Sequence, residues 1–122
     1  MRTVRIRIIQ FGTIMPFVRW ILVVACALAT APALADDPTF SILMKNNQFV
    51  PSEVQIPAGA KVKLVVRNEN STASEFESTE FHREKVVTPG QEITVFVGPL
   101  DPGSYEFFDD FHPQTRGHLV VK

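Results

Sequence analysis

The chain has little of what stabilises many small exported proteins. It contains one cysteine and one tryptophan among 122 residues, and both, Cys26 and Trp20, stand within 1–35. The remaining residues, 36–122, therefore form no disulfide of their own. They also lack a stretch with sustained helical periodicity, which argues against a helical bundle. This part of the chain has to be stabilised by its core alone, and its length suffices for one small domain.

A long hydrophobic run is also missing. The apolar run after Arg19, "WILVVACALATA", falls short of the ~20 residues that a membrane-spanning helix needs. Basic residues precede this run and the small residues "ALA" end it at 33–35, which is the order found in a secretory signal peptide. We predict a signal peptide over 1–35, cleaved after Ala35, and export to the periplasm without a membrane-embedded segment. Lipidation at Cys26 is an alternative, although the segment between Arg19 and Cys26 makes a short hydrophobic region.

Positive charge is scarce in the predicted mature domain. Residues 36–122 hold all 13 acidic residues but only 8 of the 12 Lys and Arg, so their net charge is −5. An acidic exported domain is a poor candidate for binding nucleic acid and a fair one for binding cations.

Short apolar segments separated by Pro, Gly and Asn fill residues 36–122. "AKVKLVVRN" at 60–68 alternates apolar and charged residues, as a half-buried strand does. Similar segments recur at turn-delimited spacing, which predicts an all-β sandwich. The other predicted strands lie at 39–44, within 46–59, and at 75–78, 83–87, 91–98, 104–110 and 118–122.

The stretches "VPSEVQIPAGAKVKLVVRNENS", "EFES" and "VVTPGQEITVFVGPLDPGSYEFFDDFHP" resemble the cupredoxin family over nearly all of 40–122. More narrowly, the chain is similar to the EfeO/FtrB-type periplasmic components of bacterial ferrous-iron uptake. The resemblance implies a cupredoxin-like Greek-key β-sandwich, 36–122, with a metal site at one end built from two loops.

The resemblance also implies which residues occupy the ligand positions. A blue copper site uses two histidines, a cysteine and usually a methionine. Here Glu75 falls at the first histidine position, Asp109 at the cysteine position, His112 at the second histidine position, and Thr115 near the methionine position. Without a thiolate, blue-copper electron transfer is excluded.

Strand alternation places some of these residues together. In "SYEFFDD", Tyr105, Phe107 and Asp109 share one face, so Asp109 is the last inward residue, and His112 in the next loop can fold back beside it. The alternative is turn chemistry, because Asp side chains cap turns. Asp110 points away from Asp109 and is expected to be solvated.

The segment "EFES" contributes the other candidates. Glu75 and Glu77 share a face, with Phe76 on the opposite one. Two carboxylates and an imidazole suit iron or manganese better than Cu(I), because oxygen ligands are hard. Glu77 could instead support a ligand or be a solvated strand residue. The predicted metal ligands are Glu75, Glu77, Asp109 and His112, and roles for Glu84, His82 and His118 stay open, with surface or structural positions expected.

The predicted function is iron binding for ferrous-iron uptake. Similar proteins are thought to oxidise iron(II) and pass it to a membrane permease alongside a P19-like periplasmic partner, so a ferroxidase role is open. The alternative is a non-catalytic carrier of copper or another divalent metal, although only Met44 and no cysteine remain in 36–122 to supply soft ligands. A third interpretation is a scaffold that has lost its metal and serves only as an interaction module.

Overall fold

The computed structural model describes Gly12 and residues 31–122, and these residues form nine short strands and no helix. The predicted signal peptide falls almost entirely outside these residues. Within the described part, no helix is long and apolar enough to cross a membrane. The strands are β1 (Thr39–Lys45), β2 (Gln48–Val50), β3 (Glu53–Ile56), β4 (Val62–Asn68), β5 (Ser74–Ser78), β6 (Arg83–Val87), β7 (Glu92–Val97), β8 (Gly103–Asp109) and β9 (His112–Val121).

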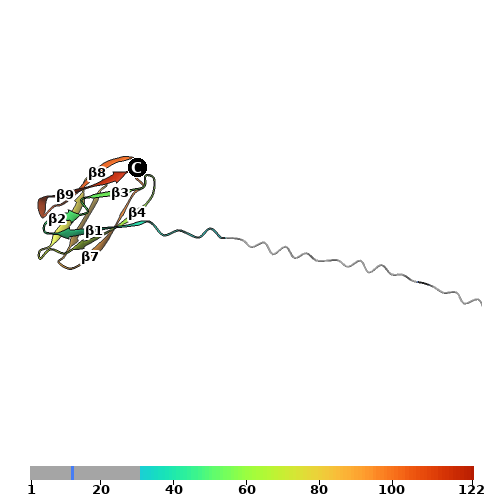
Figure 1. Ribbon diagram of the computed structural model, residues 1–122, viewed down its shortest axis with the longest axis horizontal. Helices are drawn as coiled ribbons and strands as arrows, with labels where there is room; N and C mark the ends of the chain where they lie inside the picture. Colours follow the sequence, from blue (N-terminus) through green and yellow to red (C-terminus); the bar gives the residue numbers. More distant parts are fainter. Residues whose placement is uncertain (1–11, 13–30) are drawn as a thin grey trace, which may run out of the picture. The chain divides into compact units, whose positions relative to one another are not determined.

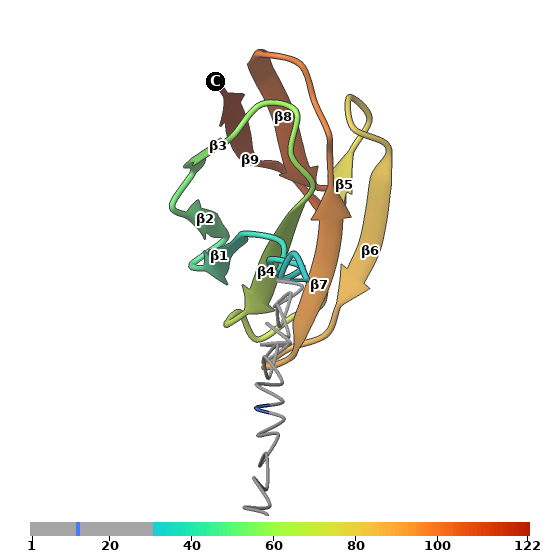
Figure 2. The same cartoon turned by 90° about the vertical axis from the view of Figure 1, so that its right-hand side faces the viewer.

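The strands form two sheets, whose arrangement can be followed in Figures 1 and 2. One sheet has the order β2-β1-β4-β7 and the other the order β3-β9-β8-β5-β6. β1 runs parallel to β4 and β3 parallel to β9, and the other neighbours are antiparallel. The predicted all-β, cupredoxin-like sandwich is thus confirmed.

The core lies between the sheets and follows from period-two alternation along the strands. β4 shows this most clearly, because Val62, Leu64 and Val66 are fully buried while the residues between them are not. Three aromatic rings fill the end of the core near the turn between β8 and β9. The Phe107 ring centroid lies 4.8 Å from that of Phe49 and 5.2 Å from that of Phe76. Edge-to-face and tilted contacts of this kind add to the free energy gained by burial alone.

A tight turn joins β1 to β2. Asn46 and Asn47 have φ angles of 52° and 55° between the paired residues Lys45 and Gln48. Two successive positive φ values define a type I′ hairpin, and asparagine tolerates them better than most residues. The turn directs the carbonyl group of Asn47 towards β9, where it accepts a hydrogen bond from the Thr115 hydroxyl.

Candidate metal centre

The side chains of strand β5 alternate between the two faces of its sheet. Ser74 and Phe76 point into the sandwich and are completely buried, whereas Glu77 is half-buried on the opposite side. The predicted alternation of Glu75 and Glu77 against Phe76 is confirmed. The two glutamates therefore lie on the outer face of the five-stranded sheet, the face turned away from the core.

Asp109 lies on the inner face. It pairs in register with Phe76, and cross-strand partners project to the same side of a sheet. Its side chain is 1% exposed, and its Oδ2 is 2.8 Å from His112 Nδ1. Asp109 and His112 are thus brought together at the end of β8, as the sequence predicts.

The Asp109 carboxylate also binds main-chain groups. Its Oδ1 accepts hydrogen bonds from the N–H of Glu75 at 2.9 Å and from that of Phe111 at 3.0 Å. The bond from Phe111, two residues ahead, is the turn-type interaction considered from the sequence. The side chain of Asp109 therefore connects β5 to the β8–β9 turn.

These contacts keep Asp109 ionised. Burial opposes its charge, but hydrogen bonds from the Glu75 N–H, the Ser74 hydroxyl, His112 and the Phe111 N–H outweigh that effect and lower the pKa of Asp109. The Ser74 oxygen is buried without a hydrogen bond of ordinary geometry, yet it lies close enough to Asp109 to contribute to this shift. It is Ser74, one residue before Glu75, that faces Asp109 from β5.

The four predicted ligands consequently form two pairs on opposite faces of one sheet. Asp109 and His112 lie inside, and Glu75 and Glu77 lie outside. A displacement of one residue along a strand reverses the face to which its side chain points. Glu75, the residue at the first ligand position of the sequence-based assignment, therefore points away from Asp109, and its neighbour Ser74 points towards it.

A third acidic residue joins the outer pair. Carboxylate oxygens of Glu75, Glu77 and Asp110 lie within 4.8 Å of one another. The Asp110 N–H donates to the Glu75 carbonyl oxygen at 3.0 Å, which holds the end of β8 beside β5. Asp110 is exposed, as the sequence predicts, but its convergence on the glutamates depends on this pairing between distant segments.

The outer group, defined as Glu75, Glu77, Asp110 and the neighbouring Glu84, concentrates negative charge. A hydrogen bond with Glu84, partial burial and the repulsion of the nearby carboxylates raise the pKa of Glu75 to about 7. Burial, Asp110 and Glu84 raise the pKa of Glu77 as well. Among the described residues, no salt bridge involves a member of the group.

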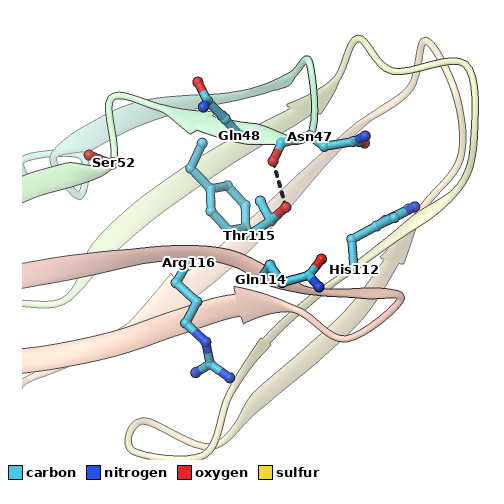
Figure 3. Close-up of a pocket in the computed structure, with 8 residues that line it drawn as sticks. Asn47, Gln48, Ser52, His112, Gln114, Thr115 and Arg116 are labelled. Carbon is cyan, nitrogen blue, oxygen red and sulfur yellow. Dashed lines mark hydrogen bonds between the residues drawn. The ribbon is translucent and has the colours of Figure 1, made fainter.

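On the other side of His112, a groove separates the β1–β2 hairpin from β9. Its volume is about 540 Å³, and Figure 3 shows His112, Gln114 and Thr115 along one side of it, with the hydroxyl of Thr115 bonded to the carbonyl group of Asn47 at 2.5 Å. Thr115, expected near the methionine position, is thereby engaged within the protein. The His112 side chain is 32% exposed and borders this groove.

Of the other two histidines, His82 lines the same surface pocket as Glu77 and Glu84, whereas His118 lies beside Glu106. His82 is exposed, with a φ of 54°, in the turn between β5 and β6. His118 is on β9, where its Nε2 is 3.7 Å from Glu106 Oε2. Glu106 also bonds Arg116, so this part of the outer face has its charges paired.

Comparison with known proteins agrees with this architecture. A family model described as a cupredoxin-like domain matches residues 18–121. An uncharacterized protein of Rickettsia prowazekii, RP394, is 43% identical over 81 residues, which cover 66% of this chain and 65% of that protein. The match thus spans slightly less than two thirds of that relative's length.

Solved structures share the fold at low sequence identity. The metal-binding domain of the Cu(I)-exporting P-type ATPase CopA of Streptococcus pneumoniae, solved with Cu(I), has a TM-score of 0.64 and 15% identity, covering 69% of this chain and 84% of that one. Auracyanin A, a "blue" copper protein of Chloroflexus aurantiacus, has a TM-score of 0.63 and 15% identity, covering 71% and 100%. Amicyanin of Paracoccus versutus has a TM-score of 0.56 and 21% identity, covering 72% and 83%. The two sheets, their strand pairing and the family match lead to one conclusion: this chain belongs to the family of cupredoxin-like domain proteins.

Proposed function

We propose that this chain is a periplasmic iron-binding protein of a ferrous-iron uptake system, and that it binds iron through the outer group. The observation that carries this proposal is the convergence of Glu75, Glu77 and Asp110 on one face, where no salt bridge among the described residues involves any of the three. Of the four ligands predicted from the sequence, the proposal keeps Glu75 and Glu77 and adds Asp110. Asp109 and His112 lie behind the same strand.

Charge within the group favours a bound cation. Glu75 is only 9% exposed, and the neighbouring carboxyl group of Glu84 is the largest cause of its raised pKa. Neighbouring carboxylates disfavour each other's charged form, so a proton or another cation is held more tightly here than at an isolated carboxylate. Near neutral pH, a metal ion that replaces this proton would relieve the repulsion that raises the pKa of Glu75, and binding would release the proton.

The chemistry of the donors favours iron over copper. All the outer candidates are carboxylates, which are hard ligands suited to iron and manganese, whereas Cu(I) prefers thiolate and thioether sulfur. The only methionine among the described residues, Met44, is fully buried in the core and belongs to its apolar cluster. The described residues include no cysteine.

The proposal also includes oxidation of the bound iron(II) by the protein. Anionic oxygen ligands stabilise iron(III) more than iron(II), so they lower the reduction potential and make loss of an electron easier. Each iron(II) would transfer one electron to dioxygen or to a partner protein such as the P19-like component, and the iron(III) would pass to a membrane permease.

Equilibrium dialysis of the purified protein against iron(II), iron(III), manganese, copper and zinc tests the binding. We expect iron to bind, and we expect Glu77→Gln and Asp110→Asn to weaken binding by at least about tenfold, because loss of a residue that merely orients a metal ligand already costs about 10–100-fold. Glu53→Gln is the matched control, because Glu53 is an exposed acid of β3 in the same sheet. Tighter binding of copper, lost in His112→Ala but kept in Glu77→Gln, would favour the alternative copper carrier.

The rate at which iron(II) disappears in air, followed with a ferrous chelator, tests oxidation. Wild type should accelerate it and Glu77→Gln should not. Iron binding without acceleration, even with a partner protein added, would leave a carrier and refute the ferroxidase part.

A further inference from the structure

Asp109 makes three hydrogen bonds at the inner face, and two of them end on the segments that carry the outer group. Oδ1 accepts from the N–H of Glu75, whose side chain belongs to that group, and from the N–H of Phe111, the residue after Asp110. Oδ2 meets His112 Nδ1 at 2.8 Å. We call the carboxylate and these three partners the Asp109 clamp.

The clamp fixes the position of the outer ligands. The Asp109 bond to Glu75 N–H and the Asp110 bond to the Glu75 carbonyl oxygen hold both sides of one peptide segment of β5 against the end of β8. At this point the pairing of β8 with β9 is irregular, with a register shift between Phe108 and Asp109. The pairing of β8 with β9 therefore does not set the direction of Asp110, and the constraint comes from the β5 side, through the Asp110 bond to the Glu75 carbonyl oxygen and the buried Asp109 carboxylate.

The oxygen atoms of the Asp109 carboxylate are already used in hydrogen bonds within the protein. A carboxylate that accepts two main-chain N–H groups and one imidazole has little capacity left for a metal ion, and breaking any of these bonds would leave a buried polar group without a partner. In the part of the chain that the structure describes, no side-chain hydrogen bond or salt bridge of this kind engages the carboxylate of Glu75 or Asp110.

We infer that Asp109 and His112 are positioning residues, not metal ligands: with no metal at the inner face, they hold Glu75 and Asp110 in the geometry that binds iron at the outer face. This inference rests on the proposed function for the outer group and assigns the inner pair a different part in it. Residues that orient metal ligands through hydrogen bonds typically change metal affinity about 10–100-fold when removed.

Two substitutions at one position separate a clamp from a ligand. In Asp109→Asn, the amide oxygen can accept from the N–H groups of Glu75 and Phe111, and the amide nitrogen can donate to His112 Nδ1. The clamp is kept while the anionic ligand is lost, so iron affinity should stay within about threefold of wild type. Asp109→Ala removes the clamp, and iron affinity should fall about 10–100-fold, as expected for the loss of an orienting hydrogen-bond partner.

Thr115→Val is the control for a general loss of stability. It deletes a buried hydroxyl and its bond to the Asn47 carbonyl group, on the hairpin side of His112. We expect it to lower the unfolding temperature and leave iron affinity unchanged. All affinities are measured well below the unfolding temperature of each variant.

Two further measurements keep the inference falsifiable if Asp109→Ala does not fold. X-ray absorption at the iron edge of wild type should show a shell of oxygen ligands without imidazole. In the metal-free protein, exchange of the Glu75 and Phe111 amide hydrogens should be slow in wild type and in Asp109→Asn.

Several results would overturn the inference. An imidazole signal that disappears in His112→Ala would make His112 a ligand. An Asp109→Asn variant that loses iron as completely as Asp109→Ala would make the carboxylate a ligand, and a folded Asp109→Ala variant with wild-type affinity would refute positioning. If wild type binds no iron, the proposed function fails, and fast exchange of the Glu75 amide in wild type would then reject the clamp as well.

Discussion

The main-chain N–H of Glu75 donates a hydrogen bond to Oδ1 of Asp109 at 2.9 Å, although the two side chains lie on opposite faces of the same sheet. Glu75 therefore contributes to both sites: its main-chain N–H binds Asp109 of the inner pair, and its carboxylate belongs to the outer group. This relationship couples the cupredoxin-type end of the sandwich to an acidic surface behind it.

The first prediction tests which residue of β5 faces Asp109. The double variant Ser74→His with Asp109→Cys should place an imidazole, a thiolate and His112 on the inner face. A set of two histidines and one cysteine is the one used by blue-copper proteins. We expect this variant to bind copper(II) with an intense visible absorption band that wild type lacks.

The matched control for the first prediction is Glu75→His with Asp109→Cys. It introduces the same two residue types, but its imidazole should point to the outer face and miss the thiolate. Circular dichroism establishes that both variants are folded. A strong band in the Glu75 variant, with none in the Ser74 variant, would reverse the assignment of faces.

The second prediction concerns pH. Neighbouring carboxylates raise the pKa of Glu75 from 4.5 to about 7 in the folded protein. A raised pKa in an acid means that the folded state binds the proton more tightly, so this contribution to stability is present below about pH 4.5 and is lost as the pH rises through about 7. The unfolding temperature of the metal-free protein should therefore fall between about pH 5 and about pH 8.

Glu75→Gln should flatten this pH dependence, because an amide does not titrate. Asp109 acts in the opposite direction at lower pH, since its pKa is lowered and its contribution is lost only as the pH falls below its ordinary value of 3.8. Iron should bind more weakly as the pH falls below about 7, because it competes with the proton on Glu75. A Glu75→Gln profile identical to that of wild type would contradict this account.

The third prediction concerns Gly117 on β9, opposite Phe107. A Cβ at this position would lie 2.5 Å from atoms of the Phe107 ring and 2.7 Å from the carbonyl oxygen of Ser52. Gly117→Ala should lower the free energy of unfolding by about 1–3 kcal/mol through overpacking, measured by chemical denaturation. Gly103→Ala is the control, because its nearest neighbour would be 3.5 Å away, and its effect should be clearly smaller.

The fourth prediction concerns Asn68, which is fully buried at the end of β4. Its amide nitrogen donates to the carbonyl oxygens of Thr72 and Val87 at 2.8 and 2.9 Å, and its oxygen accepts from the N–H of Asn70 at 2.9 Å. Asn68→Ala should cost about 2 kcal/mol or more, because buried polar groups lose their partners. Asn70→Ala, which removes only an exposed bond to the Asn47 N–H, should cost at most about 1 kcal/mol; equal losses would contradict the argument.

Local patterns in the sequence are sufficient for much of the fold. The alternation in 60–68 corresponds to β4, and the asparagine pair at 46–47 closes the β1–β2 hairpin. Alternation also assigns Phe107 and Asp109 to the inner face and Glu75 to the face opposite Phe76. These features depend on the two-residue period of a strand and on which residues tolerate a positive φ, and both are properties of neighbouring residues.

The fold class, the strands and the chemical types of the candidate ligands thus follow from local sequence patterns. Which of these ligands meet depends on how distant strands pair. The pairing of Phe76 with Asp109 joins segments 33 residues apart and places Glu75 behind the sheet instead of beside Asp109. Because a shift of one residue reverses every side chain of a strand, a sequence pattern that leaves register open cannot place Ser74 against Asp109 or bring Asp110 to the glutamates.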